Sequence, residues 1–207
     1  MKFTELGLSS GILTSIEKLG FETPTPIQAE AIPFLLREQQ DLIGLASTGT
    51  GKTAAFGLPL IERVDDTLEV TQAVVLAPTR ELGVQIAEDM KRFAVHRPKL
   101  RIAAVYGGAN IVPQIKALKA GAQIVVATPG RLVDLIERKA ARLEQVRALV
   151  LDEADEMLNM GFKEEIDSIL SSLQLHTLHA LTHHRTNLLR HLKHRRLTPQ
   201  INRPNLI

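Results

Sequence analysis

Short unbroken runs of apolar residues recur along the chain and alternate with longer stretches in which apolar residues repeat at helical spacing. Apolar runs of this length are typical of strands covered on both faces, as they are in a parallel sheet. These runs predict strands at 41–45, 73–77, 101–106, 123–127 and 148–151. The helical spacing predicts helices at 9–19, 26–36, 52–61, 80–93, 112–119 and 131–137. The alternation of strands and helices predicts an α/β fold, a doubly wound parallel sheet with helices on both faces.

Composition narrows the class of protein. The chain has 207 residues, 44% of them hydrophobic, which is enough to bury the core of one domain. No apolar run approaches the roughly 18 residues of a membrane helix, and Glu5 stands where a secretion signal has its apolar core, so we expect a cytoplasmic protein without membrane contact. Because the chain has no cysteine, disulfides, thiolate metal sites and cysteine nucleophiles are excluded.

The formal net charge of +2 hides an uneven distribution along the chain. Residues 173–207 contain six of the 25 basic residues, six of the seven histidines and none of the 23 acidic residues. Residues 1–172 therefore carry 19 basic and 23 acidic groups, a net charge of −4. Nucleic-acid binding by this mildly acidic part has to come from individual groups placed against phosphates rather than from a general positive field.

The first predicted strand leads into a segment typical of a phosphate-binding loop, Ala46-Ser47-Thr48-Gly49-Thr50-Gly51-Lys52-Thr53. In such a loop, backbone N–H groups point inward, the lysine reaches the terminal phosphates of a nucleotide and the threonine offers a hydroxyl to Mg²⁺. The general motif has glycine at the position of Ala46. A flexible loop before an ordinary helix is the alternative, but Gly-Lys-Thr directly after a buried strand favours the phosphate site.

Carboxylates follow the last predicted strand, at Asp152-Glu153-Ala154-Asp155. The carboxyl ends of parallel strands share one edge of a sheet, so we expect these groups to lie near Lys52. There Asp152 can hold Mg²⁺ through water, and Glu153 can take a proton from the attacking water. Taken alone, acids at a helix start are more often a cap that complements the helix dipole. Combined with the loop at Lys52, they indicate a nucleotide-hydrolysing site.

Together these segments resemble the first RecA-like (P-loop) domain of a DEAD-box RNA helicase, a family whose phosphate loop begins with alanine. The resemblance spans about residues 3–170. Besides the phosphate loop and the acidic tetrad, it rests on four segments in family order: Gly20-Phe21-Glu22-Thr23-Pro24-Thr25-Pro26-Ile27-Gln28, Pro78-Thr79-Arg80-Glu81-Leu82, Gly107-Gly108 and Thr128-Pro129-Gly130-Arg131. It implies RNA-stimulated ATP hydrolysis that drives local duplex unwinding.

The resemblance implies a set of nucleotide contacts. Gln28 is expected to hydrogen-bond the adenine edge, because an amide offers both a donor and an acceptor, and this favours ATP over GTP. Phe3 is expected to pack on the base, and Phe21, Thr23 and Asp155 are expected to belong to the same site. For Phe3 and Phe21, positions in the hydrophobic core are the alternative.

The resemblance also implies sequence-independent RNA binding by three loops, which contain Pro78-Thr79-Arg80, Gly107-Gly108 and Thr128-Pro129-Gly130-Arg131. Glycines let the backbone approach phosphates closely, and hydroxyls, N–H groups and arginines bind sugar and phosphate oxygens without reading bases. Without the resemblance, a turn with a helix start and a flexible loop explain the same residues more simply.

The resemblance divides the chain into an adenine-recognition (Q-motif) region at 1–35, a RecA-like ATP-binding domain at 36–172 and an atypical tail at 173–207. After this point the family has a Ser-Ala-Thr segment on a further strand, which lies between the strand before the phosphate loop and the strand before the acidic tetrad. A second RecA-like domain follows in the family. The 207 residues contain neither, and the histidines and threonines around 173–181 predict a poor replacement strand.

The tail leaves a second function open. Its histidines 176, 179, 183 and 184 have no carboxylate or cysteine near them, so the pattern does not favour a metal site. Helicase activity in the family needs a second domain whose arginines stabilise the transferring phosphoryl group, so we expect no unwinding by this chain alone. The alternative is a non-catalytic module that binds RNA or another polyanion through its basic tail.

Overall fold

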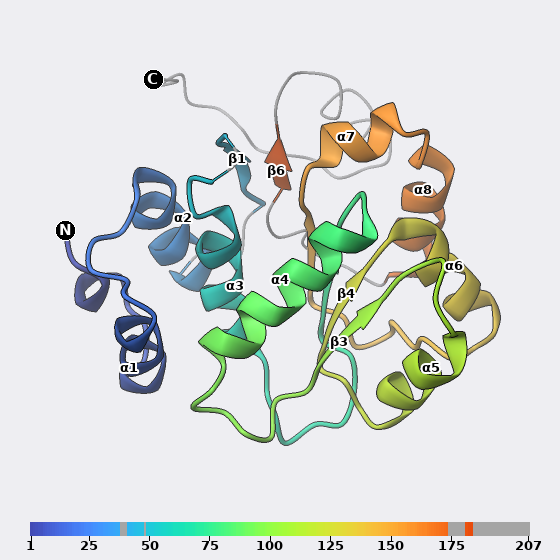
Figure 1. Ribbon diagram of the computed structural model, residues 1–207, viewed down its shortest axis with the longest axis horizontal. Coiled ribbons are helices and arrows are strands. Elements are labelled where there is room, and N and C mark those ends of the chain that lie inside the picture. The colour runs from blue at the N-terminus through green and yellow to red at the C-terminus, as the bar shows by residue number, and fades with distance from the viewer. Residues whose placement is uncertain (38–40, 48, 174–180, 184–207) are drawn as a thin grey trace.

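The computed structural model describes residues 1–37, 41–47 and 49–173, together with the backbone of 181–183. The chain begins with a 3₁₀ turn, η1 (Phe3–Glu5), and then alternates between helices and strands (Figure 1). The helices are α1 (Ser10–Lys18), α2 (Pro26–Arg37), α3 (Lys52–Arg63), α4 (Arg80–Phe93), α5 (Ile111–Lys119), α6 (Pro129–Glu137), α7 (Ala154–Asn159) and α8 (Lys163–Ser172). The strands are β1 (Ile43–Leu45), β2 (Ala73–Leu76), β3 (Ile102–Val105), β4 (Ile124–Ala127), β5 (Ala148–Leu151) and β6 (Leu181–His183).

The strands of the described residues form one parallel sheet in the order β1-β6-β5-β2-β4-β3. Strand β2 is central, and its Val74 lies level with Val125 of β4 and Leu149 of β5. Because every strand runs in the same direction, the loops that lead into α3, α4, α6 and α7 begin at one edge of the sheet. The predicted α/β fold with a doubly wound parallel sheet is confirmed.

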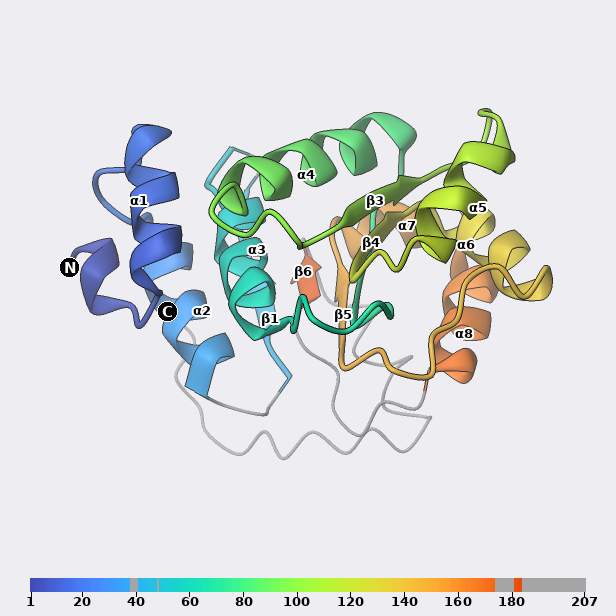
Figure 2. The ribbon, with the colours of Figure 1, turned by 90° about the horizontal axis from the view of Figure 1, so that it is seen from below.

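Helices cover both faces of the sheet (Figure 2). The strand residues alternate between two hydrophobic clusters, one on each face. In β2, Ala73 and Val75 pack with α1 to α4, whereas Val74 and Leu76 pack with α5, α6, α7 and α8. All four side chains are fully buried. This two-residue alternation between two buried faces explains why β2 has no polar position.

Strand β6 corrects one expectation from the sequence. The tail predicted a poor replacement strand, yet Leu181–His183 lies in the slot between β1 and β5. Its three residues pair with Ile43–Leu45 on one side, and Leu181 pairs with Leu151 on the other. Backbone groups on both flanking strands need partners wherever the sheet is covered, and this demand outweighs the weak strand propensity of the segment. The sheet therefore extends past residue 172.

The observed helix boundaries lie close to the predicted ones. The predicted helix 80–93 is confirmed from end to end, and the Thr79 hydroxyl caps it by accepting a hydrogen bond from the Leu82 backbone N–H at 3.3 Å. Helix α3 continues two residues beyond the predicted end at Ile61. The sequence analysis did not predict α7 and α8, because α7 has only six residues and α8 begins with charged ones.

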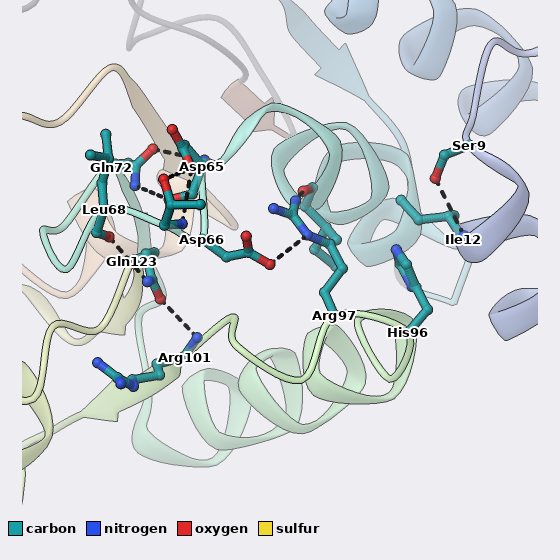
Figure 3. A network of polar contacts seen from close by, with 12 residues as sticks. Ser9, Ile12, Asp65, Asp66, Leu68, Gln72, His96, Arg97, Arg101 and Gln123 are labelled. Atoms are coloured by element: carbon teal, nitrogen blue, oxygen red, sulfur yellow. Dashed lines mark hydrogen bonds and ion pairs between the residues drawn. The ribbon is translucent and has the colours of Figure 1, made fainter.

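Two buried glutamines, Gln72 and Gln123, lie at the amino ends of β2 and β4 and bond neighbouring backbone segments there (Figure 3). The Gln123 side chain accepts a hydrogen bond from the Arg101 N–H at 2.8 Å and donates one to the Leu68 carbonyl at 3.1 Å. Gln72 bonds both backbone groups of Asp65 in the same manner.

In the part of the chain that the structure describes, no helix is long and apolar enough to cross a membrane.

Candidate nucleotide and RNA site

The predicted phosphate loop connects β1 to α3. Gly49 and Gly51 have φ angles of +78° and +83°, a left-handed conformation that favours glycine. A side chain at Gly51 would also collide with the Gln28 amide. Thr50 closes the loop by donating its hydroxyl to the Ser47 carbonyl at 2.7 Å. Ala46 precedes this turn, and Thr48 lies outside the described residues.

A cleft of about 570 Å³ opens beside the phosphate loop. Lys52 and Thr53, the first residues of α3, line it together with Asp152 and Glu153 from the end of β5. Lys52 and Asp152 are 100 positions apart in the chain, and the parallel sheet brings them together because both follow the carboxyl end of a strand. The predicted convergence of these groups is therefore present in the fold.

Glu153 has unusual backbone and electrostatic properties. Its φ of 51° is left-handed, which is strained for a residue with a side chain, and it occupies the N-cap position of α7. Burial raises the pKa of its carboxyl above the ordinary value, the adjacent Asp152 carboxylate raises it further, and Lys52 lowers it. Asp152 is only 3% exposed. Asp155, in the first turn of α7, also raises the pKa of Glu153.

Gln28 lies against the phosphate loop rather than along the cleft. It is 2% exposed, and its amide nitrogen donates to the Gly51 carbonyl at 3.1 Å while its amide oxygen accepts from the Thr25 N–H at 3.0 Å. The Thr25 hydroxyl donates to the Thr50 carbonyl at 2.8 Å. The amide that the sequence analysis assigned to adenine thus already bonds two backbone groups. Thr23, expected at the same site, is exposed on the preceding loop.

Aromatic side chains also line the cleft. Phe21 and Phe93 line it, with their ring centroids 5.8 Å apart in an edge-on arrangement. Phe3 is 5% exposed and packs edge-on against the other side of Phe21, at 5.9 Å. Phe3 therefore occupies a core position in this structure, which the sequence analysis kept as its alternative, whereas Phe21 faces both the core and the cleft.

One wall of the cleft was not predicted from the sequence. Helix α4 contributes Leu82, Gln85, Asp89 and Phe93, which recur every three or four residues and so share one face. Burial raises the pKa of Asp89, and its carboxylate lies 3.6 Å from Arg92. Helical spacing could have shown that these residues share a face, but not that the face borders the phosphate loop.

The three predicted RNA loops meet at the carboxyl ends of β2, β3 and β4. The Gly107 N–H donates to the Thr128 hydroxyl at 3.4 Å, and the guanidinium of Arg80 lies over the Tyr106 ring, 4.8 Å from its centroid. Gly108 has a φ of +71°. Pro78 and Pro129 are buried, whereas Gly130 is exposed.

The two arginines of these loops lie differently. Arg80 is exposed, as a phosphate-binding group has to be. The side chain of Arg131 is 12% exposed, and its guanidinium donates to the Ala109 carbonyl at 3.2 Å and approaches Asp134 at 3.9 Å. Arg131 therefore bonds the backbone next to the Gly107-Gly108 loop, while its Nη1 is buried and has no hydrogen-bond partner among the described residues.

A model of the DEAD/DEAH box helicase family matches residues 25–189. The chain belongs to this family. Two similar proteins are the DEAD-box ATP-dependent RNA helicases CshA of Bacillus cereus and Streptococcus pneumoniae, which are 54% and 56% identical to it over 171 residues. Each match covers 83% of this chain and 32% of the relative, so the chain spans about a third of the length of these relatives.

Solved structures of DEAD-box proteins agree with the fold. The crystal structure of a DEAD box protein from the hyperthermophile Methanococcus jannaschii matches 97% of this chain and 54% of its own, with 42% identity and a TM-score of 0.89. A hypothetical ATP-dependent RNA helicase from Sulfolobus tokodaii matches 93% of this chain and 56% of its own, with 32% identity and a TM-score of 0.82. The chain thus has the RecA-like fold of DEAD-box proteins.

The donor groups of this DEAD-box cleft suit a magnesium ion that arrives with a nucleotide. Mg²⁺ is commonly held by one or two carboxylates plus phosphate oxygens and water. Asp152 and the Thr53 hydroxyl supply such oxygens in one cleft. Among the described residues, no group of three or more histidines and carboxylates could hold a metal ion by itself. The donors therefore fit Mg²⁺ bound jointly by protein and phosphate.

Proposed function

We propose that this DEAD-box chain binds ATP with Mg²⁺ in the cleft between the phosphate loop and the end of β5. We propose further that it binds RNA, independently of sequence, across the loops that follow β2, β3 and β4. It then serves as the amino-terminal RecA-like unit of an ATP-dependent RNA helicase, the activity named for its CshA relatives. The observation that carries the proposal is the single cleft lined by Lys52, Thr53, Asp152 and Glu153.

In this proposal each side chain has a distinct task. The Lys52 ammonium binds the terminal phosphates, and Thr53 and Asp152 hold the magnesium ion. Bound Mg²⁺ neutralises negative charge on the phosphates. Glu153 accepts a proton from the attacking water, and its raised pKa makes its carboxylate a stronger base than an ordinary glutamate.

We propose that these 207 residues alone hydrolyse ATP slowly and do not separate strands. The family's second domain supplies arginines to the transferring phosphoryl group, a contribution of about 10³–10⁵ in rate where such residues have been tested. The much greater length of the CshA relatives supports this division of labour. Addition of that domain is expected to restore RNA-stimulated hydrolysis.

Calorimetric titration with Mg·ATP tests the nucleotide site. Lys52→Ala is expected to weaken ATP binding at least tenfold, about 1.4 kcal/mol, because a charge in direct phosphate contact is lost. Lys163→Ala is the matched control, since Lys163 is likewise the first residue of a helix but does not line the cleft. It is expected to bind ATP like the parent. Equal affinities for Lys52→Ala and the parent would contradict the assignment.

The basic tail remains the competing source of RNA binding, because it holds six basic residues and no acidic one. Deleting it would also remove β6 from the sheet, so its charge has to be neutralised instead. Replacement of Arg190, Lys193, Arg195 and Arg196 by glutamine is expected to leave most RNA affinity in place. Loss of most affinity, with a much shallower dependence on salt, would favour the tail-driven module.

A further inference from the structure

Tyr106 ends the segment before the two glycines of the second RNA loop and lies outside every motif that we assigned to RNA. Its ring lies under the guanidinium of Arg80, although the two residues are 26 positions apart. We propose that Tyr106 is a positioning residue that holds Arg80 in orientation for an RNA phosphate. This inference rests on the proposed RNA-binding function and deepens it.

The contact with Tyr106 leaves the hydrogen-bond donors of Arg80 available. A cation over an aromatic ring is attracted by the π face of the ring, so the contact takes up none of the five N–H groups of the guanidinium. Among the described residues, none of the hydrogen bonds or ion pairs involves this guanidinium, and Arg80 is exposed. A phosphate can therefore approach the edge of the guanidinium without displacing a protein partner.

The backbone of Tyr106 is restrained by hydrogen bonds from α5. The side-chain amide of Gln114, which is 7% exposed, accepts a hydrogen bond from the Tyr106 N–H at 3.1 Å and donates one to the Tyr106 carbonyl at 3.2 Å. The same amide donates to the Asn110 carbonyl at 3.3 Å. Gln114, from α5, thus bonds the backbone at both ends of the loop and restrains the main chain that carries the Tyr106 ring.

The rest of the loop is restrained in a similar way. The Thr128 hydroxyl accepts from Gly107, and Arg131 donates to the carbonyl of Ala109. Of the two arginines in the RNA motifs, Arg131 is mostly buried and bonds this loop, whereas Arg80 is exposed. Pre-ordering a long side chain lowers the entropy lost on binding, and Tyr106 supplies that order for Arg80.

Binding of a fluorescein-labelled decauridylate, followed by anisotropy on the whole chain, tests the inference. Tyr106→Leu keeps an apolar side chain but removes the aromatic face, and it is expected to weaken RNA binding about two- to fivefold, the range of an exposed cation–π contact (about 0.5–1 kcal/mol). Tyr106→Phe keeps the face and is expected to bind like the parent. In an Arg80→Met background, Tyr106→Leu is expected to cost nothing further, because its effect passes through Arg80.

Intrinsic fluorescence adds a readout that a general loss of structure would not reproduce. The chain has one tyrosine and no tryptophan, so its tyrosine emission reports Tyr106 alone. Unlabelled decauridylate is expected to change this emission in the parent and to leave it unchanged in Arg80→Met, after correction against free N-acetyltyrosinamide. The ATP affinity of Tyr106→Leu, measured as for Lys52→Ala, is expected to match the parent.

Several results would overturn the inference. These are undiminished RNA affinity in Tyr106→Leu, an equal loss in Tyr106→Phe, or additive losses in the double variant. A fall in ATP affinity equal to the fall in RNA affinity would also overturn it, because it would indicate a general structural role. If the parent chain does not bind decauridylate at all, both the RNA part of the proposed function and this inference fail. RNA binding that does not respond to Tyr106→Leu rejects this inference alone.

Discussion

The amide nitrogen of Gln28 donates a hydrogen bond to the carbonyl of Gly51 over 3.1 Å. This contact joins the first turn of α2 to the phosphate loop, 23 positions further along the chain. The Thr25 hydroxyl makes a second link, to the neighbouring Thr50 carbonyl. The two bonds restrain the loop where its left-handed glycine leads into α3. Gln28 therefore influences the phosphate loop whether or not it also contacts a base.

Removal of this amide is expected to affect both stability and ATP binding. Gln28→Ala leaves the part-buried Thr25 N–H and Gly51 carbonyl without these partners, a cost of about 1–3 kcal/mol in unfolding free energy. ATP affinity is expected to fall about tenfold, because binding then has to order the loop as well. Urea unfolding and calorimetric titration measure the two effects.

Gln123→Ala is the matched control for this variant. Gln123 is 1% exposed and also bridges an N–H and a carbonyl, at the opposite edge of the sheet. It is expected to lower stability by a similar amount while the folded protein binds ATP like the parent. Unchanged ATP affinity in Gln28→Ala would refute the proposed influence of Gln28 on the loop.

Glu153→Gln is expected to stabilise the apo chain and abolish hydrolysis. Because folding raises the pKa of Glu153, it favours the protonated carboxyl over the charged one. This favourable contribution is complete below the ordinary pKa of 4.5 and is lost as pH rises through the higher pKa of the folded state. A neutral glutamine avoids that loss, so the variant is expected to gain about 0.2–1 kcal/mol at pH 8, the range for partly exposed charge pairs.

Urea unfolding between pH 4 and pH 8 measures this difference in stability. The advantage of Glu153→Gln is expected to shrink as pH falls and to disappear near pH 4. ATP affinity is expected to remain within a few-fold of the parent, because Glu153 is proposed to act on water rather than on phosphate. A variant that is less stable than the parent at pH 8 would contradict the electrostatic account of this site.

Thr182 is the middle residue of β6 and lies level with Gly44 of β1. Thr182→Pro is expected to lower the unfolding free energy by about 3 kcal/mol or more, because proline removes a ladder donor from an interior strand and its ring clashes with the neighbouring backbone. Thr182→Val keeps the N–H group and is expected to be as stable as the parent. Urea unfolding distinguishes the two, and equal stability of all three proteins would show that β6 contributes nothing to the sheet.

Local pattern was sufficient to predict much of the fold and the place of the candidate nucleotide site. The helix at Arg80–Phe93 and the strand at Ala148–Leu151 were predicted to the residue, because helical spacing and a continuous apolar run mark them in the sequence. The groups proposed to bind phosphate and magnesium line one cleft, as their positions after the strands predicted. Strand and helix alternate regularly, so the loops at the carboxyl ends of the strands have to share one edge of the sheet.

Contacts between segments that are distant in the sequence could not be predicted from local pattern. A weak strand former such as Leu181–His183 enters the sheet because β1 and β5 leave backbone groups to satisfy, and this demand comes from outside the segment. Arg80 and Arg131 look alike in their motifs, yet the exposed Arg80 lies over the Tyr106 ring, whereas the mostly buried Arg131 bonds the Ala109 carbonyl. Their different surroundings come from neighbouring strands and helices. The sequence by itself therefore determines which chemical groups are present, and the tertiary structure determines which residues each group contacts.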